Sequence, residues 1–156
     1  MAAAGKWKLY EPAIEYLADG THDLDDTSNW KMALFLSTSN CDTLSNGVYG
    51  DLTNEHANEN GYTTGGVALD NASWTHAASV GTWDIDNGVW TASSGSIVAR
   101  FAVIYRNATV NSIVKPLLCV SLLDTAPANV TATDGNTLTV AINASGVFTL
   151  TGGTSN

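Results

Sequence analysis

The segment SIVARFAVIYRN, residues 96–107, is apolar at almost every position apart from Arg100. A continuous apolar run of this length, rich in Val, Ile and aromatic residues, is typical of a strand that is buried on both faces. The segment KPLLCVSLLD, residues 115–124, has the same character, and Pro116 lies near its start, where a missing N–H group is tolerated. We therefore expect two adjacent strands at the centre of the molecule.

Further short segments are rich in Val, Ile, Thr, Leu or aromatic residues, and most are bounded by Gly, Asn or Asp, as strands are. They are residues 30–38, 65–78, 81–86, 88–93, 136–143 and 146–152. Asn87-Gly88 is a strong hairpin signal, and the four residues from Asn143 to Gly146 predict a second hairpin.

One helix is expected near the start of the chain. Glu11-Pro12 suits a helix entrance, the spacing of Tyr10, Ile14 and Leu17 predicts one apolar face, and residues 18–20 (Ala-Asp-Gly) end it. A second helical turn is expected within residues 47–58. The pattern as a whole predicts one mainly β domain over residues 1–156, an antiparallel sandwich or barrel with a short N-terminal helix. Residues 1–6 and 152–156 are expected to be flexible ends or assembly arms.

The stretch ENGYTTGGVALDNASW, residues 59–74, has the densest glycines of the chain. A phosphate-binding loop needs a lysine after its glycines, or Gly-x-Gly-x-x-Gly before a helix, and this stretch has neither. We expect a turn with Gly65 or Gly66 at positive φ or in a bulge. Tyr62 is expected to pack at this turn, and Val67 and Leu69 to face the core.

The chain carries 15 acidic and six basic residues, a formal net charge of −9. Binding to nucleic acid needs clustered Lys and Arg, whereas the basic residues here are scattered, so we expect no direct nucleic-acid partner. No apolar run approaches the roughly 20 residues of a membrane-spanning helix, so no membrane partner is expected either. The N-terminus lacks the apolar core of a signal peptide. Cys41 and Cys119 are expected to be buried thiols of a protein folded in a reducing cytoplasm.

No arrangement of residues typical of catalysis is visible, so we expect no enzyme, no catalytic residue and no cofactor. Acidic residues gather at positions 19–26 and at 84–86, but counting from Asp84 puts Val89 and Gly95 where an EF-hand needs Gly and Glu. The three His residues lie far apart in sequence, which argues against zinc. The four glutamates 11, 15, 55 and 59 would form a glycosidase pair only by accident of folding. No metal site is expected.

Trp74, Trp83 and Trp90 allow a second interpretation. Aromatic residues on the face of a β-sandwich can stack on sugar rings, and these three are the candidate glycan contacts. The competing interpretation, that they fill the core, is favoured because strand aromatics mostly pack in the core or in cross-strand pairs.

The order of these features resembles a group of small tailed-bacteriophage virion proteins. The features are the short leading helix, DGTHDLDDTSNWKMALFLSTSN, GYTTGGVAL, ARFAVIYRN, KPLLCVSLLD and the closing GVFTL, which together span about residues 6–150. The resemblance implies a structural protein of the virion, such as a capsid decoration (cement) protein or a neck, collar or tail component.

The partners that this resemblance implies are other virion proteins, namely major capsid, neck or tail proteins. It also implies a homo-oligomer, with a trimer as one form, assembled in the cytoplasm of a bacterial host. The acidic charge would keep such a protein from sticking to packaged DNA. The alternative function is a receptor- or glycan-binding module of a phage tail or fibre.

Overall fold

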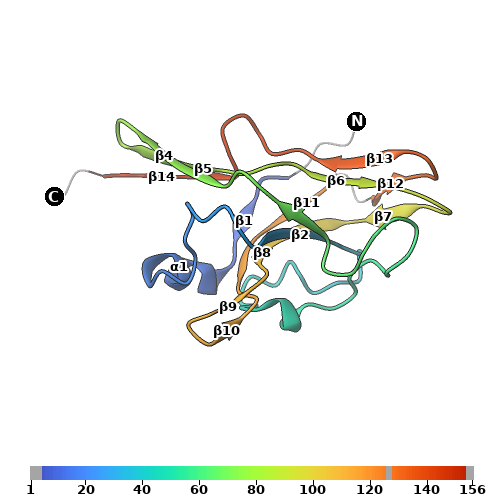
Figure 1. Ribbon diagram of the computed structural model, residues 1–156, viewed down its shortest axis with the longest axis horizontal. Helices are drawn as coiled ribbons and strands as arrows, with labels where there is room; N and C mark the ends of the chain where they lie inside the picture. Colours follow the sequence, from blue (N-terminus) through green and yellow to red (C-terminus); the bar gives the residue numbers. More distant parts are fainter. Residues whose placement is uncertain (1–4, 126–127, 154–156) are drawn as a thin grey trace.

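A five-stranded antiparallel sheet forms one layer of the protein (Figure 1). The computed structural model describes residues 5–125 and 128–153. The strand order in this sheet is β1-β11-β8-β2-β3, and every neighbouring pair is antiparallel. Its strands are β1 (Lys8–Leu9), β2 (Trp30–Phe35), β3 (Val67–Leu69), β8 (Phe101–Arg106) and β11 (Leu117–Leu122).

Strand β8 lies inside this sheet, between β11 and β2. All six of its residues are buried, so both of its faces are covered, as an unbroken apolar run requires. The prediction of a central strand within residues 96–107, with residues 115–124 as its neighbour, is confirmed.

Three smaller antiparallel sheets form the second layer, which lies above β2 and β8 in Figure 1. One has the order β14-β5-β4, and the other two are the pairs β6-β13 and β7-β12. Their strands are β4 (Ser73–Ala77), β5 (Val80–Asp84), β6 (Gly88–Thr91), β7 (Ile97–Ala99), β12 (Val130–Ala132), β13 (Thr137–Val140) and β14 (Phe148–Thr151). The prediction of a mainly β, sandwich-like fold with one short helix is confirmed.

The chain passes from one layer to the other at Arg100, the polar interruption of the central apolar run. Strand β7 ends at Ala99 in the second layer, and β8 begins at Phe101 in the first. The guanidinium of Arg100 donates to the main-chain oxygen of Asp124 (3.2 Å), on the returning segment between β11 and β12. A short hairpin, β9 (Thr109–Val110) and β10 (Ile113–Val114), joins β8 to β11.

Aromatic side chains fill the space between the two layers. The rings of Trp30 on β2 and Trp83 on β5 lie 5.0 Å apart, and both side chains are fully buried. Trp90 on β6 is 3% exposed and also belongs to the core. The three rings together occupy a large part of the core, since each Trp buries about 200 Å².

Helix α1 (Glu11–Ala18) and a single 3-10 turn, η1 (Tyr49–Asp51), match the two predicted helical segments. The helix lies against β11. Its predicted apolar face is only partly right, because Ile14 is 64% exposed while Ala13 is buried. The helix is eight residues long, and the small side chain of Ala13 lets it approach the sheet closely.

The hairpin predicted at Asn87-Gly88 does not form. Strand β5 pairs with β4 and β14, whereas β6 pairs with β13, so the chain continues past Gly88 without folding back. A Cβ atom at Gly88 would lie 2.6 Å from the sulfur of Met32 and 2.8 Å from the ring of Trp90, so any larger residue would have to displace these core side chains. The Oδ1 of Asn87 accepts a hydrogen bond from the main-chain N–H of Ile142 (2.7 Å).

The hairpin predicted at residues 143–146 is also wrong. The turn exists, since Gly146 N donates to Asn143 O (2.8 Å), but β13 and β14 on either side of it belong to different sheets. In the second layer, a hairpin instead joins β4 to β5 through Ala78 and Ser79. Ala78 adopts a φ of 53° there, in the left-handed region that alanine rarely occupies, so the residue type does not predict this turn.

The predicted flexible ends lie partly outside the described residues, at positions 1–4 and 154–156. Within the described part, Gly5 N donates to Leu122 O (2.7 Å) and Gly152 N donates to Ser79 O (2.7 Å). The backbone of Gly5 and of Gly152 is therefore held by a hydrogen bond to the domain.

Candidate functional site

Two of the three candidate glycan contacts are inaccessible. Trp83 has no exposed surface and Trp90 is 3% exposed. A ring without exposed surface cannot stack on a sugar, so both are removed from the candidate contacts. Their burial agrees with the core interpretation. Trp74 on β4 is half-buried and remains available.

Trp74 lies in a groove at the end of the three-stranded sheet. The groove measures about 360 Å³, and its lining includes His76, Gly81 and Leu150. A Cβ atom at Gly81 would lie 2.1 Å from Cζ2 of Trp74, so the missing side chain lets the indole lie against the backbone of β5. The groove offers one aromatic ring and one imidazole, and no charged side chain lines it.

The glycine-rich stretch is a turn held by a carboxylate. Glu55 Oε1 accepts hydrogen bonds from Gly65 N (2.7 Å) and from the hydroxyl of Tyr62 (2.5 Å). Its Oε2 accepts from the hydroxyl of Tyr49. The hydroxyl of Tyr105 donates to the main-chain oxygen of Gly65 (2.8 Å) and holds the other side of the turn. Burial raises the pKa of all three tyrosines.

These contacts confirm the structural interpretation of the glycines. Gly65 and Gly66 both have positive φ, of 91° and 72°, and β3 follows them. Tyr62 and Leu69 are buried, and Val67 is partly buried, as expected. The N–H group of Gly65 already donates to the carboxylate of Glu55, and this negative charge would repel a phosphate or other anion at the turn.

The acidic residues near the start of the chain form turns rather than a metal site. Asp19, Asp23 and Asp26 each accept a hydrogen bond from a main-chain N–H two residues further on. Hydrogen bonds from Ser28 lower the pKa of Asp26, which also forms an ion pair with Arg106. Asp25 accepts from the main-chain N–H of Trp74 (2.9 Å). In the part of the chain that the structure describes, no three His, Cys, Asp or Glu side chains are placed to hold a metal ion.

The three histidines lie apart, as their sequence spacing indicates. His76 is exposed on β4, and His56 is buried with Nδ1 at 2.8 Å from the oxygen of Ala57. His22 is 3% exposed and lies between the rings of Tyr16 and Trp30. Its Nε2 lies 2.9 Å from the oxygen of Leu117, and its Nδ1 has no partner among the described residues.

The two cysteines are buried and unpaired, as expected. Burial raises the pKa of Cys41 to about 12 and that of Cys119 well above its ordinary value. Neither thiol is therefore a candidate nucleophile.

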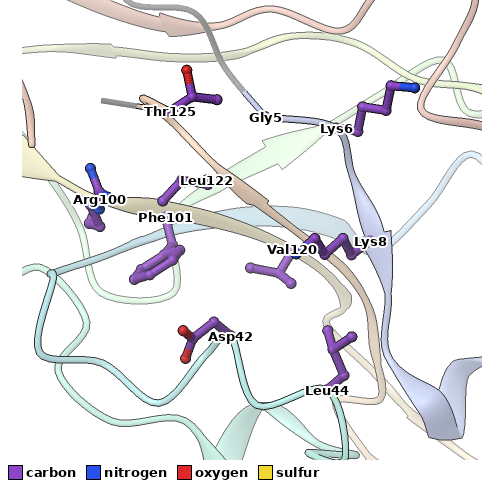
Figure 2. Close-up of a pocket in the computed structure, with 10 residues that line it drawn as sticks. All are labelled: Gly5, Lys6, Lys8, Asp42, Leu44, Arg100, Phe101, Val120, Leu122 and Thr125. Carbon is purple, nitrogen blue, oxygen red and sulfur yellow. The ribbon is translucent and has the colours of Figure 1, made fainter. Parts of the chain in front are cut away.

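A pocket of about 440 Å³ lies beside β1, β8 and β11 (Figure 2). Its floor is apolar, with Phe101, Val120 and Leu122. Lys6, Lys8 and Arg100, three of the six basic residues of the chain, lie around it, but Lys6 points away from the centre in Figure 2. The lining contains no Ser, Cys or His and a single acid, Asp42, so no nucleophile and base are paired there.

The outward side of the second layer carries small side chains and a single charged one, Asp84, which alternates with Trp83 and lies opposite Ser73. Trp83, Trp90 and Val140 point into the core, so the residues that alternate with them point outward. We term these outward residues the outer face, and they are Thr75, Ala77, Val80, Thr82, Val89, Thr91, Thr131, Thr137, Thr139, Thr149 and Thr151. Asp84 is the one Asp, Glu, Lys or Arg within the seven strands of this layer.

The sequence pattern did not reveal the outer face as a unit, because its threonines come from strands that are far apart in the chain. It also gave Glu55 no role. The one sequence feature that could have indicated this role is a glutamate ten residues before the Gly65-Gly66 turn, with Tyr49 and Tyr62 nearby in the chain.

The chain matches no protein-family model, no characterised protein and no solved structure. None of the helices among the described residues is long and apolar enough to cross a membrane.

Proposed function

We propose that the protein is a non-enzymatic structural component of a tailed-bacteriophage virion, a capsid decoration (cement) protein or a neck or collar component. It acts through protein–protein assembly with other virion proteins. The observation that carries the proposal is the outer face, a layer of Thr and Val in which Asp84 is the one charged side chain among the strand residues, on a chain of net charge −9. Such a surface buries against a neighbour with little desolvation of charge.

Three further features support this proposal. The order of motifs over residues 6–150 resembles that of small phage virion proteins, and the β core is held by large aromatic contacts such as Trp30 with Trp83. The pocket at Phe101 is lined by no Ser, Cys or His, and in the groove at Trp74 no hydrogen bond joins Ser79 to His76 among the described residues. A stable β scaffold with a nearly uncharged face suits a part that is repeated many times in a particle.

Purified particles of the phage that encodes the chain are expected to contain it in many copies. Denaturing gels with quantitative mass spectrometry of gradient-purified particles measure the copy number against the major capsid protein. Host proteins that co-sediment with the particles provide the background level. Absence of the chain from infectious particles would end the proposal.

A second candidate function, glycan or receptor binding, rests on the groove at Trp74. If the groove binds sugars, cell-surface glycans are expected to quench the fluorescence of the wild-type protein, and Trp74→Ala should abolish the response. Trp7→Ala is the matched control, since Trp7 is also half-buried but lies on the N-terminal segment. No quenching of the wild-type protein by any cell-surface glycan would eliminate this candidate.

A further inference from the structure

Strand β14 presents an unpaired backbone edge. It is the outer strand of the sheet β14-β5-β4, which projects from one end of the molecule in Figure 1. Gly152 N donates to Ser79 O, and Leu150 lies opposite Gly81. Because antiparallel ladders alternate, the N–H and C=O groups of Leu150 point to β5, whereas those of Thr149 and Thr151 point away from it. Among the described residues, no hydrogen bond satisfies these outward groups.

The opposite edge of the same sheet is protected. The outward N–H group of Trp74 on β4 is bound by the carboxylate of Asp25 (2.9 Å). Proteins commonly block edge strands with charged side chains, prolines or bulges. Strand β14 has none of these, because residues 148–151 are Phe-Thr-Leu-Thr, and no charged residue occurs anywhere in residues 135–156.

The side chains of β14 suit pairing with a copy of itself. Leu150 is 49% exposed, and Thr149 and Thr151 on either side of it are exposed too. An antiparallel pair centred on Leu150 would place Thr149 opposite Thr151 of the second copy. Each such pair exchanges two hydrogen bonds, so the outward groups satisfy one another completely. The two Leu150 side chains would face each other in the closely spaced position at the centre.

We propose that two copies of this chain associate by antiparallel pairing of their β14 edges about a two-fold axis at Leu150. The result is a continuous six-stranded sheet, β4-β5-β14 followed by the same three strands of the second copy in reverse order. This inference does not depend on the virion assignment.

Charge favours a second copy at this edge. Two molecules of net charge −9 repel each other, so they can meet closely only where charge is absent. The uncharged segment 135–156 carries β14, whereas the carboxylate of Asp25 binds the opposite edge of the sheet, on β4. An edge that pairs with itself also closes the assembly at two copies, because no free β14 edge remains.

The wild-type protein is expected to be a dimer in sedimentation equilibrium measured from micromolar to millimolar concentration. Leu150→Asp should weaken the dimer by about a hundred-fold or more, because it places two carboxylates directly opposite each other. Val114→Asp is the matched control, since Val114 on β10 is 58% exposed, lies away from β14 and the outer face, and should leave the dimer unchanged when substituted. A wild-type monomer at millimolar concentration, or a trimer, would overturn the inference.

Two further variants test the edge itself. Thr151→Pro removes an outward N–H group that the β5 ladder does not use, so it should give a folded monomer with an unchanged urea midpoint for the monomer. Leu150→Cys should form an intermolecular disulfide under mild oxidation, whereas Val114→Cys should not. A dimer that survives both Leu150→Asp and Thr151→Pro would show that the contact lies elsewhere. Presence or absence in virions is a separate readout and bears only on the proposed function.

Discussion

Replacing Gly66 with alanine is expected to lower the free energy of unfolding by about 4 kcal/mol or more, and at 37 °C the variant should accumulate largely unfolded. A Cβ atom at this position would lie 1.8 Å from the main-chain oxygen of Met32 and 2.6 Å from its carbonyl carbon. Neither atom can move without breaking the pairing of β2 with β3 and β8. Urea unfolding, followed by tryptophan fluorescence, measures the loss.

Gly135→Ala is the control that separates this collision from backbone strain. Gly135 has a φ of 77°, close to the 72° of Gly66, but nothing lies within 4 Å of a Cβ atom there. Its substitution should cost only about 1 kcal/mol, the strain of a left-handed conformation in a residue with a side chain. Equal losses at the two positions would contradict the collision with Met32.

The elements that could be predicted from sequence are those defined by local pattern. Residues 101–106 are buried on both faces of the sheet, and a strand in that environment needs apolar side chains at nearly every position, so its sequence pattern is recognisable. Helix α1 begins at Glu11-Pro12 because these residues favour the first turn of any helix. The turn at Gly65-Gly66 was predictable because only glycine adopts its backbone angles freely.

The pairing of strands was not predictable in the same way. Asn87-Gly88 has the composition of a two-residue hairpin, yet the glycine is there because β6 passes close to the sulfur of Met32. The hairpin between β4 and β5 turns at Ala78 and Ser79, which do not form a typical two-residue hairpin sequence. A glycine that relieves a contact between layers and a glycine that permits a turn look identical in sequence, so tertiary packing decides between them.

The candidate site was predictable only in part for the same reason. Trp74 and Trp83 lie opposite each other on the same face of their sheet, yet Trp83 is fully buried and Trp74 only half-buried. Whether such a tryptophan lies in the core depends on which part of the sheet the other layer covers, and a strand pattern does not reveal this. The role of Glu55 depends on three partners that only the folded chain brings together, and the pairing edge of β14 depends on Asp25 blocking the other edge.

Acidification from pH 7 to pH 4 is expected to cost the protein about 3 kcal/mol of stability through one residue, His22. The pKa of His22 is lowered to about 4, chiefly by burial and in smaller part by the nearby guanidinium of Arg106, against the opposing effects of Leu117 O and Asp19. The side chain is 3% exposed, and its Nδ1 has no acceptor for a second proton among the described residues.

The protein loses stability on acidification because His22 binds a proton more readily in the unfolded chain than in the folded one. In the unfolded chain His22 takes up a proton near pH 6.5, whereas in the folded protein it does so only near pH 4. Between these values the unfolded state binds more protons, so stability falls as the pH falls. The cost is about 1.4 kcal/mol for each unit of difference in pKa. The lowered pKa values of Asp19 and Asp26 act in the same direction, but only below the ordinary aspartate value of 3.8.

Urea unfolding at pH 7.0 and at pH 4.5 emphasises the contribution of His22, because the lowered pKa values of Asp19 and Asp26 keep both carboxylates ionised in the folded protein over that interval. The wild-type protein should lose about 2.5 kcal/mol between the two conditions, as the His22 pKa requires. His22→Gln should be less stable at pH 7 but nearly insensitive to this change, because glutamine takes up no proton. His76→Gln is the control, since His76 is exposed on β4 and its removal should leave the loss unchanged. A wild-type protein that is equally stable at both pH values would contradict the burial of a neutral imidazole at this position.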